Sequence, residues 1–301
     1  MARVSENSRY TSTQNRIGMV RQMADETQET AISGRKLHKM SDDPVAAVRV
    51  LKNKTKLENI RQYRKTLDFA KGYLSKTEDA LLGVNESLMR AKELSVQQSN
   101  ATWDANTRAT VAEEIRELAD HVVQLGNSTY GDRYVFGGFQ TGQPPIAPDG
   151  NFLGDDGLVF VQVDEDSFRP INIPGREIFD VPPAEDGKNK PVVQVLRQIY
   201  GALKNNDMNT LHSSMQQLDL SLSRMIQSTA SLGARRASID DVGERLDRSE
   251  ERLFIDNNEL EAADPVKSAM DLKRAETAMQ YTLQSSAKIL SPSLMSFLGP
   301  S

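Results

Sequence analysis

Large apolar residues recur at every seventh position along one stretch of the chain. The members of this series are Ile60, Leu67, Leu74, Leu81 and Leu88. An interleaved set completes an alternating spacing of three and four residues: Tyr63, Ala70, Thr77, Val84 and Ala91. This spacing is typical of the seam of a coiled coil. The stretch is therefore predicted to form one long helix that pairs with another helix.

A second and longer heptad series follows nearer the C-terminus. Its members are Leu211, Leu218, Met225, Leu232, Ile239, Leu246, Leu253 and Leu260. The interleaved positions are apolar at first, at Met215 and Leu222, and then become Arg236, Gly243, Glu250 and Asn257. That later half of the seam is expected to face solvent or another chain. Proline is absent from 45–143 and from 192–264, so each series can be a single helix of roughly 80 Å.

Two shorter amphipathic helices are predicted beside these, and the segment between them differs in kind. The helical stripes are Val111, Ile115, Leu118, Val122 and Leu125, then Val192, Val195, Ile199 and Leu203. Residues 131–191 hold eight of the twelve prolines and nine of the eighteen glycines. Within them "GLVFVQV" (157–163) and "FRPINI" (168–173) read as short strands, the second an edge strand because of Pro170.

The ends of the chain carry thinner stripes and are predicted to order on assembly. The proposed subunit-assembly stripe is Ile17, Val20, Met270, Leu272, Met279, Leu283, Leu290, Leu294 and Leu298. We expect five segments. They are an N-terminal helix (1–40), the first half of a rod (41–130), a β-rich insertion (131–191), the second half of the rod (192–264) and a C-terminal amphipathic helix (265–301).

The composition agrees with an elongated fold. Hydrophobic residues make up 38% and aromatic residues 6% of the chain, which suits narrow helical stripes better than a thick core. The predicted fold class is mainly α, an elongated antiparallel helical rod or coiled-coil bundle with a small β-rich insertion and terminal amphipathic helices.

The segment Ser41-Asp42-Asp43-Pro44 raises the question of a reactive acidic pair. Two adjacent carboxylates could hold a metal or act as an acid and base. Ser41 or Asp43 could also cap a helix whose first residue is Pro44, with both carboxylates opposing the helix dipole. Because a long heptad helix follows, we interpret the segment as a helix start.

Other patterns typical of catalytic or metal sites are missing from the sequence. There is no cysteine, and His38, His121 and His212 are not spaced as metal ligands. The glycine-rich stretch 137–142 lacks the Lys-Ser/Thr of a phosphate loop. The acidic clusters 155–156 and 164–166 are interpreted as solvated loop charge, since no EF-hand alternation accompanies them. No catalytic, cofactor-binding or metal site is expected, and the protein is not expected to be an enzyme.

Charge is unevenly distributed along the chain, although the net charge of −5 is mild. Residues 35–76 contain twelve basic and four acidic residues, whereas 145–190 contain ten acidic and four basic residues. Two interpretations stay open: solvated faces, or complementary contacts between neighbouring subunits. The basic stretch shows no base-reading chemistry, so nucleic acid is not an expected partner.

Five segments together resemble the flagellin superfamily. They are "SGRKLHKMSDDPVAA" (33–47), "AKELSVQQSNAT" (91–102), "LGNSTYGDRYVFGGFQTGQPP" (125–145), "LGARR" (232–236) and "SPSLMSFL" (291–298). Within the superfamily the chain is similar to the branch at the hook–filament junction. It has Pro44-Val45-Ala46 where flagellin usually has Ala-Ala-Gly, and it has the "RYVFGGFQTGQPP" stretch, which flagellin lacks. The early "RVSENSRY" (3–10) also resembles that branch, whereas Pro265 departs from the family pattern and is expected to sharpen a break before the last helix.

The resemblance implies a structural and extracellular role in the bacterial flagellum, without catalysis or cofactor. The implied partners are other copies of the chain in a ring, the first hook-associated protein, flagellin and a flagellar export chaperone, with no nucleic acid and no membrane. The implied export is through the flagellar secretion apparatus, consistent with the lack of a signal-peptide core or an apolar run of ~18 residues. Filament flagellin and a rod-shaped secreted effector or enzyme, with its site in 131–191, are the alternatives.

Overall fold

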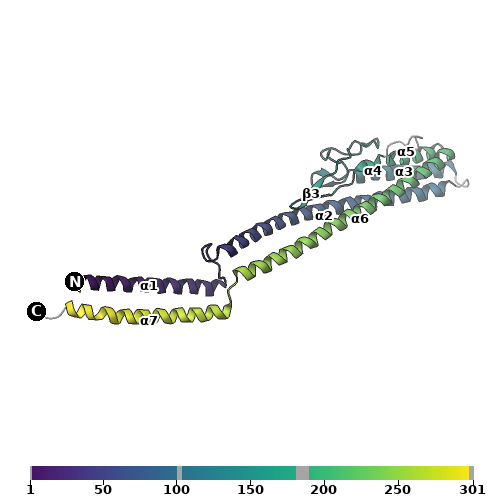
Figure 1. Cartoon of the computed structure of the whole chain (residues 1–301). Helices are drawn as coiled ribbons and strands as arrows, with labels where there is room; N and C mark the ends of the chain where they lie inside the picture. Colours follow the sequence, from purple (N-terminus) through teal and green to yellow (C-terminus); the bar gives the residue numbers. More distant parts are fainter. Residues whose placement is uncertain (1, 100–103, 181–189, 298–301) are drawn as a thin grey trace. The chain divides into compact units, whose positions relative to one another are not determined.

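The chain is mainly helical, with two small β-hairpins (Figure 1). The computed structural model describes residues 2–99, 104–180 and 190–297, without the side chains of 2–7, 9 and 289–297. The helices of this part are α1 (Ala2–Ser33), α2 (Pro44–Gln98), α3 (Ala105–Gly126), α4 (Gly175–Phe179), α5 (Val192–Lys204), α6 (Met208–Glu261) and α7 (Pro265–Phe297). The strands are β1 (Thr129–Tyr130), β2 (Arg133–Tyr134), β3 (Phe160–Asp164) and β4 (Ser167–Pro170). The predicted mainly α fold class with a small β insertion is confirmed.

Two compact units share the chain. Residues 1–58 and 249–301 form one, here called the terminal unit, and residues 59–248 form the central unit. The boundaries fall inside α2 and α6, so each long helix contributes to both units. The five-segment division expected from the sequence places its boundaries elsewhere and stays a prediction.

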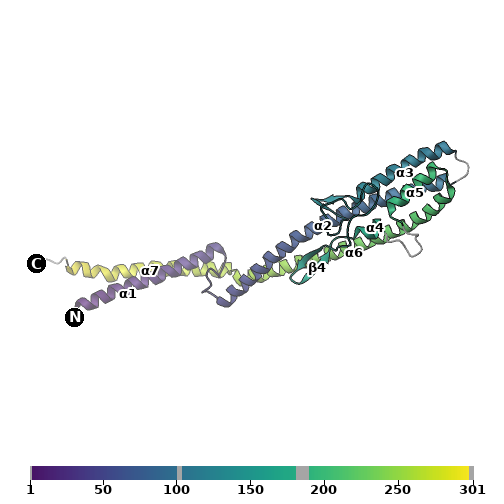
Figure 2. The same ribbon diagram turned by 90° about the horizontal axis from the view of Figure 1, so that it is seen from above.

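In the central unit α2 and α6 run antiparallel, side by side in both views (Figures 1 and 2). Ion pairs connect them along their length: Lys71 Nζ lies 2.8 Å from Asp240 Oδ1, and Lys92 Nζ lies 2.7 Å from Asp219 Oδ1. The heptad side chains between them are at most 5% exposed: Leu67, Leu74, Leu81, Leu88, Leu211, Leu218, Met225, Leu232, Ile239 and Leu246. In the central unit both heptad series thus form the seam of one helix pair, whereas the last two members of the second series, Leu253 and Leu260, are half-buried.

In the later half of the α6 seam, the expectation that the interleaved positions face solvent or another chain is wrong at Gly243 and Asn257. Arg236 is exposed, as expected, and its guanidinium pairs with Glu78 on α2. A methyl group on Gly243 would come into van der Waals contact with side chains of α2. Asn257 is 9% exposed and accepts a hydrogen bond of 3.0 Å from Asn53 Nδ2. Polar groups can occupy a seam when a partner across it satisfies them.

The remaining elements of the central unit pack around this pair. Helices α3 and α5 lie side by side. The predicted stripe of α5 is buried, whereas in α3 only Ile115 and Val122 of the predicted stripe are buried, beside Ala112 and Ala119. The rings of Phe136 and Phe179 meet edge to face, with their centroids 5.2 Å apart, inside the β-rich segment. Gly72 lets Tyr130 approach α2, because a Cβ there would lie 2.1 Å from the tyrosine hydroxyl oxygen.

The two strands expected in the insertion are present but shorter, since β3 covers only part of 157–163 and β4 only part of 168–173. They pair antiparallel as a two-stranded sheet. The glycine-rich stretch is a turn that an aspartate organises. Asp155 Oδ1 accepts hydrogen bonds from the backbone N–H groups of Phe139 (2.7 Å) and Gly157 (2.8 Å), and Gly138 has a φ of +67°. The expectation that Asp155 is only solvated loop charge is therefore wrong.

Candidate functional site

The terminal unit pairs α1 with α7 through small side chains (Figure 1). Among the described side chains of these two helices, the buried ones are Thr13, Ser268, Ala275 and Ser286. Small residues allow close approach of two helices but bury little apolar area. Because hydrophobic stabilisation scales with the apolar area removed from water, this contact is thin compared with the leucine seam of the central unit.

Large apolar side chains on the same helices are left in solvent. Their exposed fractions are Met19 71%, Met23 62%, Ile32 78%, Val266 70%, Met270 52%, Tyr281 68% and Leu283 47%. Fully burying one side chain of this size contributes about 1.5–3 kcal/mol. The exposed side chains are thus available to a further helix that the single chain does not supply.

The residues of the predicted assembly stripe fall into three groups. Ile17, Val20, Leu272 and Met279 are half-buried, whereas Met270 and Leu283 are exposed. Met270 lies on another face of α7 than Leu272, since two positions along a helix differ by about 200°. The side chains of Leu290 and Leu294, and Leu298 as a whole, lie outside the described residues.

A groove of 520 Å³ follows α1 and α7. Its lining combines small polar residues with larger apolar ones: Thr13, Arg16, Met19, Val20, Met23, Tyr281, Thr282, Ser285 and Ser286. A groove of this composition can accept the apolar side chains of another amphipathic helix.

The connections from α1 to α2 and from α6 to α7 are bonded to each other. The N–H of Lys36 donates to the Glu261 carbonyl oxygen at 2.8 Å, and the N–H of Ala263 donates to the Gly34 carbonyl oxygen at 2.9 Å. The Glu261 carboxylate also pairs with Lys54 Nζ at 2.8 Å. The two connections therefore form one joint, in which backbone hydrogen bonds tie the N-terminal segment to the C-terminal one.

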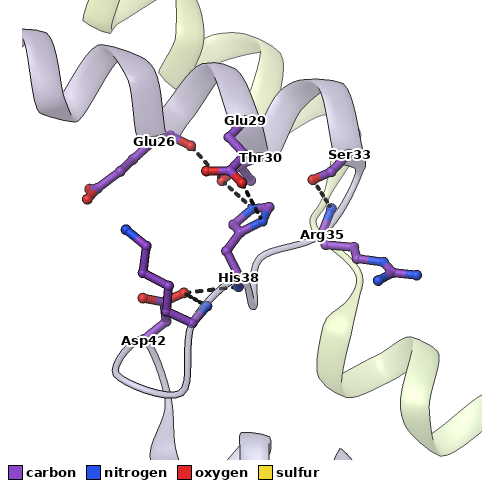
Figure 3. Close-up of polar contacts among 8 residues, drawn as sticks. Glu26, Glu29, Thr30, Ser33, Arg35, His38 and Asp42 are labelled. Atoms are coloured by element: carbon purple, nitrogen blue, oxygen red, sulfur yellow. Dashed lines mark hydrogen bonds and ion pairs between the residues drawn. The ribbon is translucent and has the colours of Figure 1, made fainter.

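His38 and Asp42 fasten the first connection to the end of α1 (Figure 3). His38 Nε2 lies 3.3 Å from Thr30 Oγ1, and its Nδ1 lies 3.6 Å from a Glu29 carboxylate oxygen. Asp42 Oδ2 accepts hydrogen bonds from the N–H groups of Lys39 (2.7 Å) and His38 (3.0 Å). These two bonds hold the pKa of Asp42 below its ordinary value, and the bond from Lys39 has the larger effect.

The predicted helix-cap motif lies at this joint. Asp43 Oδ1 accepts hydrogen bonds from the N–H groups of Val45 (3.0 Å) and Ala46 (2.9 Å), and Pro44 is the first residue of α2. Of the two cap candidates it is thus Asp43, and not Ser41, that takes this position.

The last helix begins in the same way. Asp264 Oδ1 accepts from Val266 N at 2.8 Å, and Pro265 is the first residue of α7. The sequence expectation of a break at Asp264-Pro265 agrees with this helix start.

The described residues offer no obvious centre for metal chemistry. His121 Nδ1 lies 3.2 Å from Ser87 Oγ, and His212 is exposed on α6. Across 2–99, 104–180 and 190–297 no three His, Cys, Asp or Glu side chains cluster as a metal site would require. Within the same ranges, none of the helices has the length and apolar character needed to cross a bilayer.

Comparison with known proteins identifies relatives of this arrangement. Residues 4–141 match the family described as the bacterial flagellin N-terminal helical region. The chain is 32% identical over 155 residues to flagellar hook-associated protein 3 of Escherichia coli strain K12, and this match covers 50% of the chain and 49% of that protein. The match thus spans about half the length of this curated relative.

Solved structures of similar fold include two FlgL proteins. The chain is 25% identical to FlgL of Bacillus cereus, with a TM-score of 0.60 over 69% of this chain and 99% of that one. It shares the fold of the flagellar junction protein FlgL of Legionella pneumophila, with 14% identity and a TM-score of 0.61 over 71% of this chain and 100% of that one. The inferred resemblance to the flagellin superfamily, and to its hook-associated branch, is confirmed.

Proposed function

We propose that this flagellin-like chain is a structural component of the bacterial flagellum that forms the junction between the hook-associated proteins and the flagellin filament. The observation that carries the proposal is the unfinished packing of α1 and α7, seen in a chain that resembles hook-associated protein 3. Their outward apolar side chains become buried when copies of the chain pack their terminal helices together. The assembly stripe in this proposal is Ile17, Val20, Met270, Leu272, Met279, Leu283, Leu290, Leu294 and Leu298, of which the side chains of the last three lie outside the described part of the chain.

The partners in this proposal are other copies of the chain in a ring, the first hook-associated protein on one side and flagellin on the other. An export chaperone covers the terminal helices before assembly, and the flagellar secretion apparatus exports the chain without a cleavable signal peptide. The five segments expected from the sequence then serve as two assembly-core helices (1–40 and 265–301), two rod halves (41–130 and 192–264) and the outer insertion (131–191).

Immunogold labelling of isolated flagella tests the location. The proposal expects label at one position, between hook and filament, on each flagellum. Label along the whole filament would instead identify a filament subunit, as would long filaments formed by the purified chain alone. An antibody against flagellin serves as the control. If it marks the flagella while the antibody against this chain does not, both the junction role and the filament role are contradicted.

The proposed role requires no catalysis and no cofactor. Thermal unfolding with calcium, magnesium, zinc or ATP should leave the melting temperature unchanged. A specific ligand at a hundred times its dissociation constant would add roughly 2.7 kcal/mol to the free energy of unfolding, which is easily measured. A shift of that size with any of the four would contradict the purely structural role.

A further inference from the structure

The β3–β4 hairpin of the central unit has an exposed apolar face. Its pairing places Phe160 opposite Pro170 and Gln162 opposite Phe168. Directly paired residues, and alternate residues along a strand, lie on one side of a sheet, so these four share a face. Phe160 and Phe168 are each 55% exposed on it. More than half of each residue's surface is thus open to solvent.

The turn of this hairpin carries three consecutive acidic side chains, Asp164, Glu165 and Asp166. None of them forms an ion pair with any residue in the described part of the chain. Together with burial, their negative charge raises the pKa of Tyr63 on α2. The hairpin therefore combines an aromatic face with a negative tip whose charge the chain itself leaves unneutralised.

A surface of opposite character lies at the start of α2, in the terminal unit. Residues 44–57 contain four basic and no acidic residues. Three of the four, Arg49, Lys52 and Lys56, line a depression of 340 Å³. The structure gives these three no ion-pair partner within the residues it describes. Asp256 and Glu259 of α6 lie at the other side of the depression and leave it with an excess of one positive charge.

Exposed apolar side chains also lie on this part of α2. Val45 is 67%, Val48 48% and Leu51 56% exposed, at a spacing of three residues. Residues three apart are neighbours on a helix surface, so these three make an apolar strip beside the cationic positions. We name residues 45–56 the basic segment of α2.

We infer that the β3–β4 hairpin of one copy docks on the basic segment of α2 in a second copy of the chain. The two phenylalanines cover the apolar strip, and the acidic turn lies against Arg49, Lys52 and Lys56. This rests on the proposed function only in that copies of the chain must meet in the ring. It names the surfaces by which they meet.

Complementary charge favours contact between two copies of the chain. It also favours the contact of the hairpin with the basic segment over the contact of two hairpins. A hairpin docked on another hairpin would bring two acidic turns together, and juxtaposed like charges are costly. The hairpin and the basic segment are different surfaces, so their contact is heterologous. A heterologous contact gives a ring when its rotation closes and an open helix when it does not, so this contact is of the kind that the proposed ring can use.

Charge reversal tests the contact. Glu165→Lys with Asp166→Lys, and separately Lys52→Glu with Lys56→Glu, should each lower self-association at least roughly tenfold, because like charges then face each other. All four positions are exposed, so each variant should stay folded, and a thermal melt checks this before association is compared. Combining the two reversals in one chain should restore association. If each reversal weakens self-association and the combined variant associates more weakly still, the inference is overturned.

Cysteine cross-linking tests the same contact directly, because the natural chain has no cysteine. Chains carrying Asp166→Cys are mixed with chains carrying Lys52→Cys, so that only a contact between copies gives the mixed disulfide. Glu117→Cys on α3, also exposed, replaces Asp166→Cys in the control. The inference expects several-fold more mixed dimer than the control, and equal yields would overturn it.

The location experiment separates this inference from the proposed function. Label at the junction without cross-linking in isolated flagella rejects the docking and keeps the function. When label is absent, the same cross-linking on concentrated purified chains decides the docking on its own.

Discussion

The central and the terminal helix pairs use the same helical spacing in opposite ways. Between α2 and α6 in the central unit the heptad leucines face inward and are at most 5% exposed, whereas Leu253 and Leu260 in the terminal unit are half-buried. Between α1 and α7 the inner positions hold Thr13, Ser268 and Ala275, while Met19, Tyr281 and other large residues face outward. Periodicity predicts where a helix is, whereas the size of the residues on each face tells whether the chain completes the packing by itself.

Truncating one large side chain in each helix pair should give the largest difference in the free energy of unfolding between the two pairs. Leu232→Ala or Leu246→Ala should lower the free energy of unfolding by about 2–5 kcal/mol, because each leaves a cavity in a buried seam. Leu283→Ala, the matched change in the terminal pair, should alter it by less than about 0.5 kcal/mol. Urea unfolding followed by circular dichroism measures both values. Similar losses in the two pairs would show that the contrast between them is wrong.

Substitutions at the start of α2 should have a smaller effect on the free energy of unfolding. Asp43→Ala should destabilise the protein by about 1 kcal/mol, since the N–H groups of Val45 and Ala46 lose their acceptor. Ser41→Ala is the control, because the serine is exposed and outside the cap, and a change within about 0.5 kcal/mol is expected. Thermal unfolding compares the two variants. A larger loss with Ser41→Ala would mean that the serine caps the helix.

The smallest expected effect is a pH dependence of the hydrogen bonds that the Asp42 carboxylate accepts in the joint. The pKa of Asp42 is lowered from its ordinary value of 3.8 by the hydrogen bonds from Lys39 and His38. A lowered pKa means that the carboxylate's contribution is complete above about pH 4, and is lost as the pH falls through the pKa of the folded protein.

The backbone amide resonances of His38 and Lys39 report this titration. In the natural chain they should shift with a midpoint below 3.8, and in Asp42→Asn the titration should disappear. A midpoint at or above the ordinary value would show that the carboxylate does not hold the connection.

Sequence reasoning reached those features that depend on local pattern. Heptads located α2 and α6 because an apolar stripe must face a partner, and Asp-Pro marked the start of a helix because proline fits its first position. The resemblance to a family with a long helical pair came from short motifs such as the segment 33–47.

What sequence reasoning missed depends on contacts between distant residues. Nothing local shows that Asp155 holds the glycine-rich turn, or that Asn257 finds Asn53 across 204 positions of the chain. The backbone bonds that join Lys36 to Glu261 and Ala263 to Gly34 carry no side-chain signal at all.

Hydrogen exchange of the terminal helices, in the free chain and in isolated flagella, tests the central claim most directly. In the free chain the amides of α1 and α7 should exchange much faster than those of α2 and α6 in the central unit. Their thin contact cannot easily offset an ordering cost of about 1–2 kcal/mol per residue. In flagella the same amides should become protected. Equal protection of both pairs in the free chain, or unprotected terminal helices in flagella, would contradict the account of a helix pair completed by its neighbours.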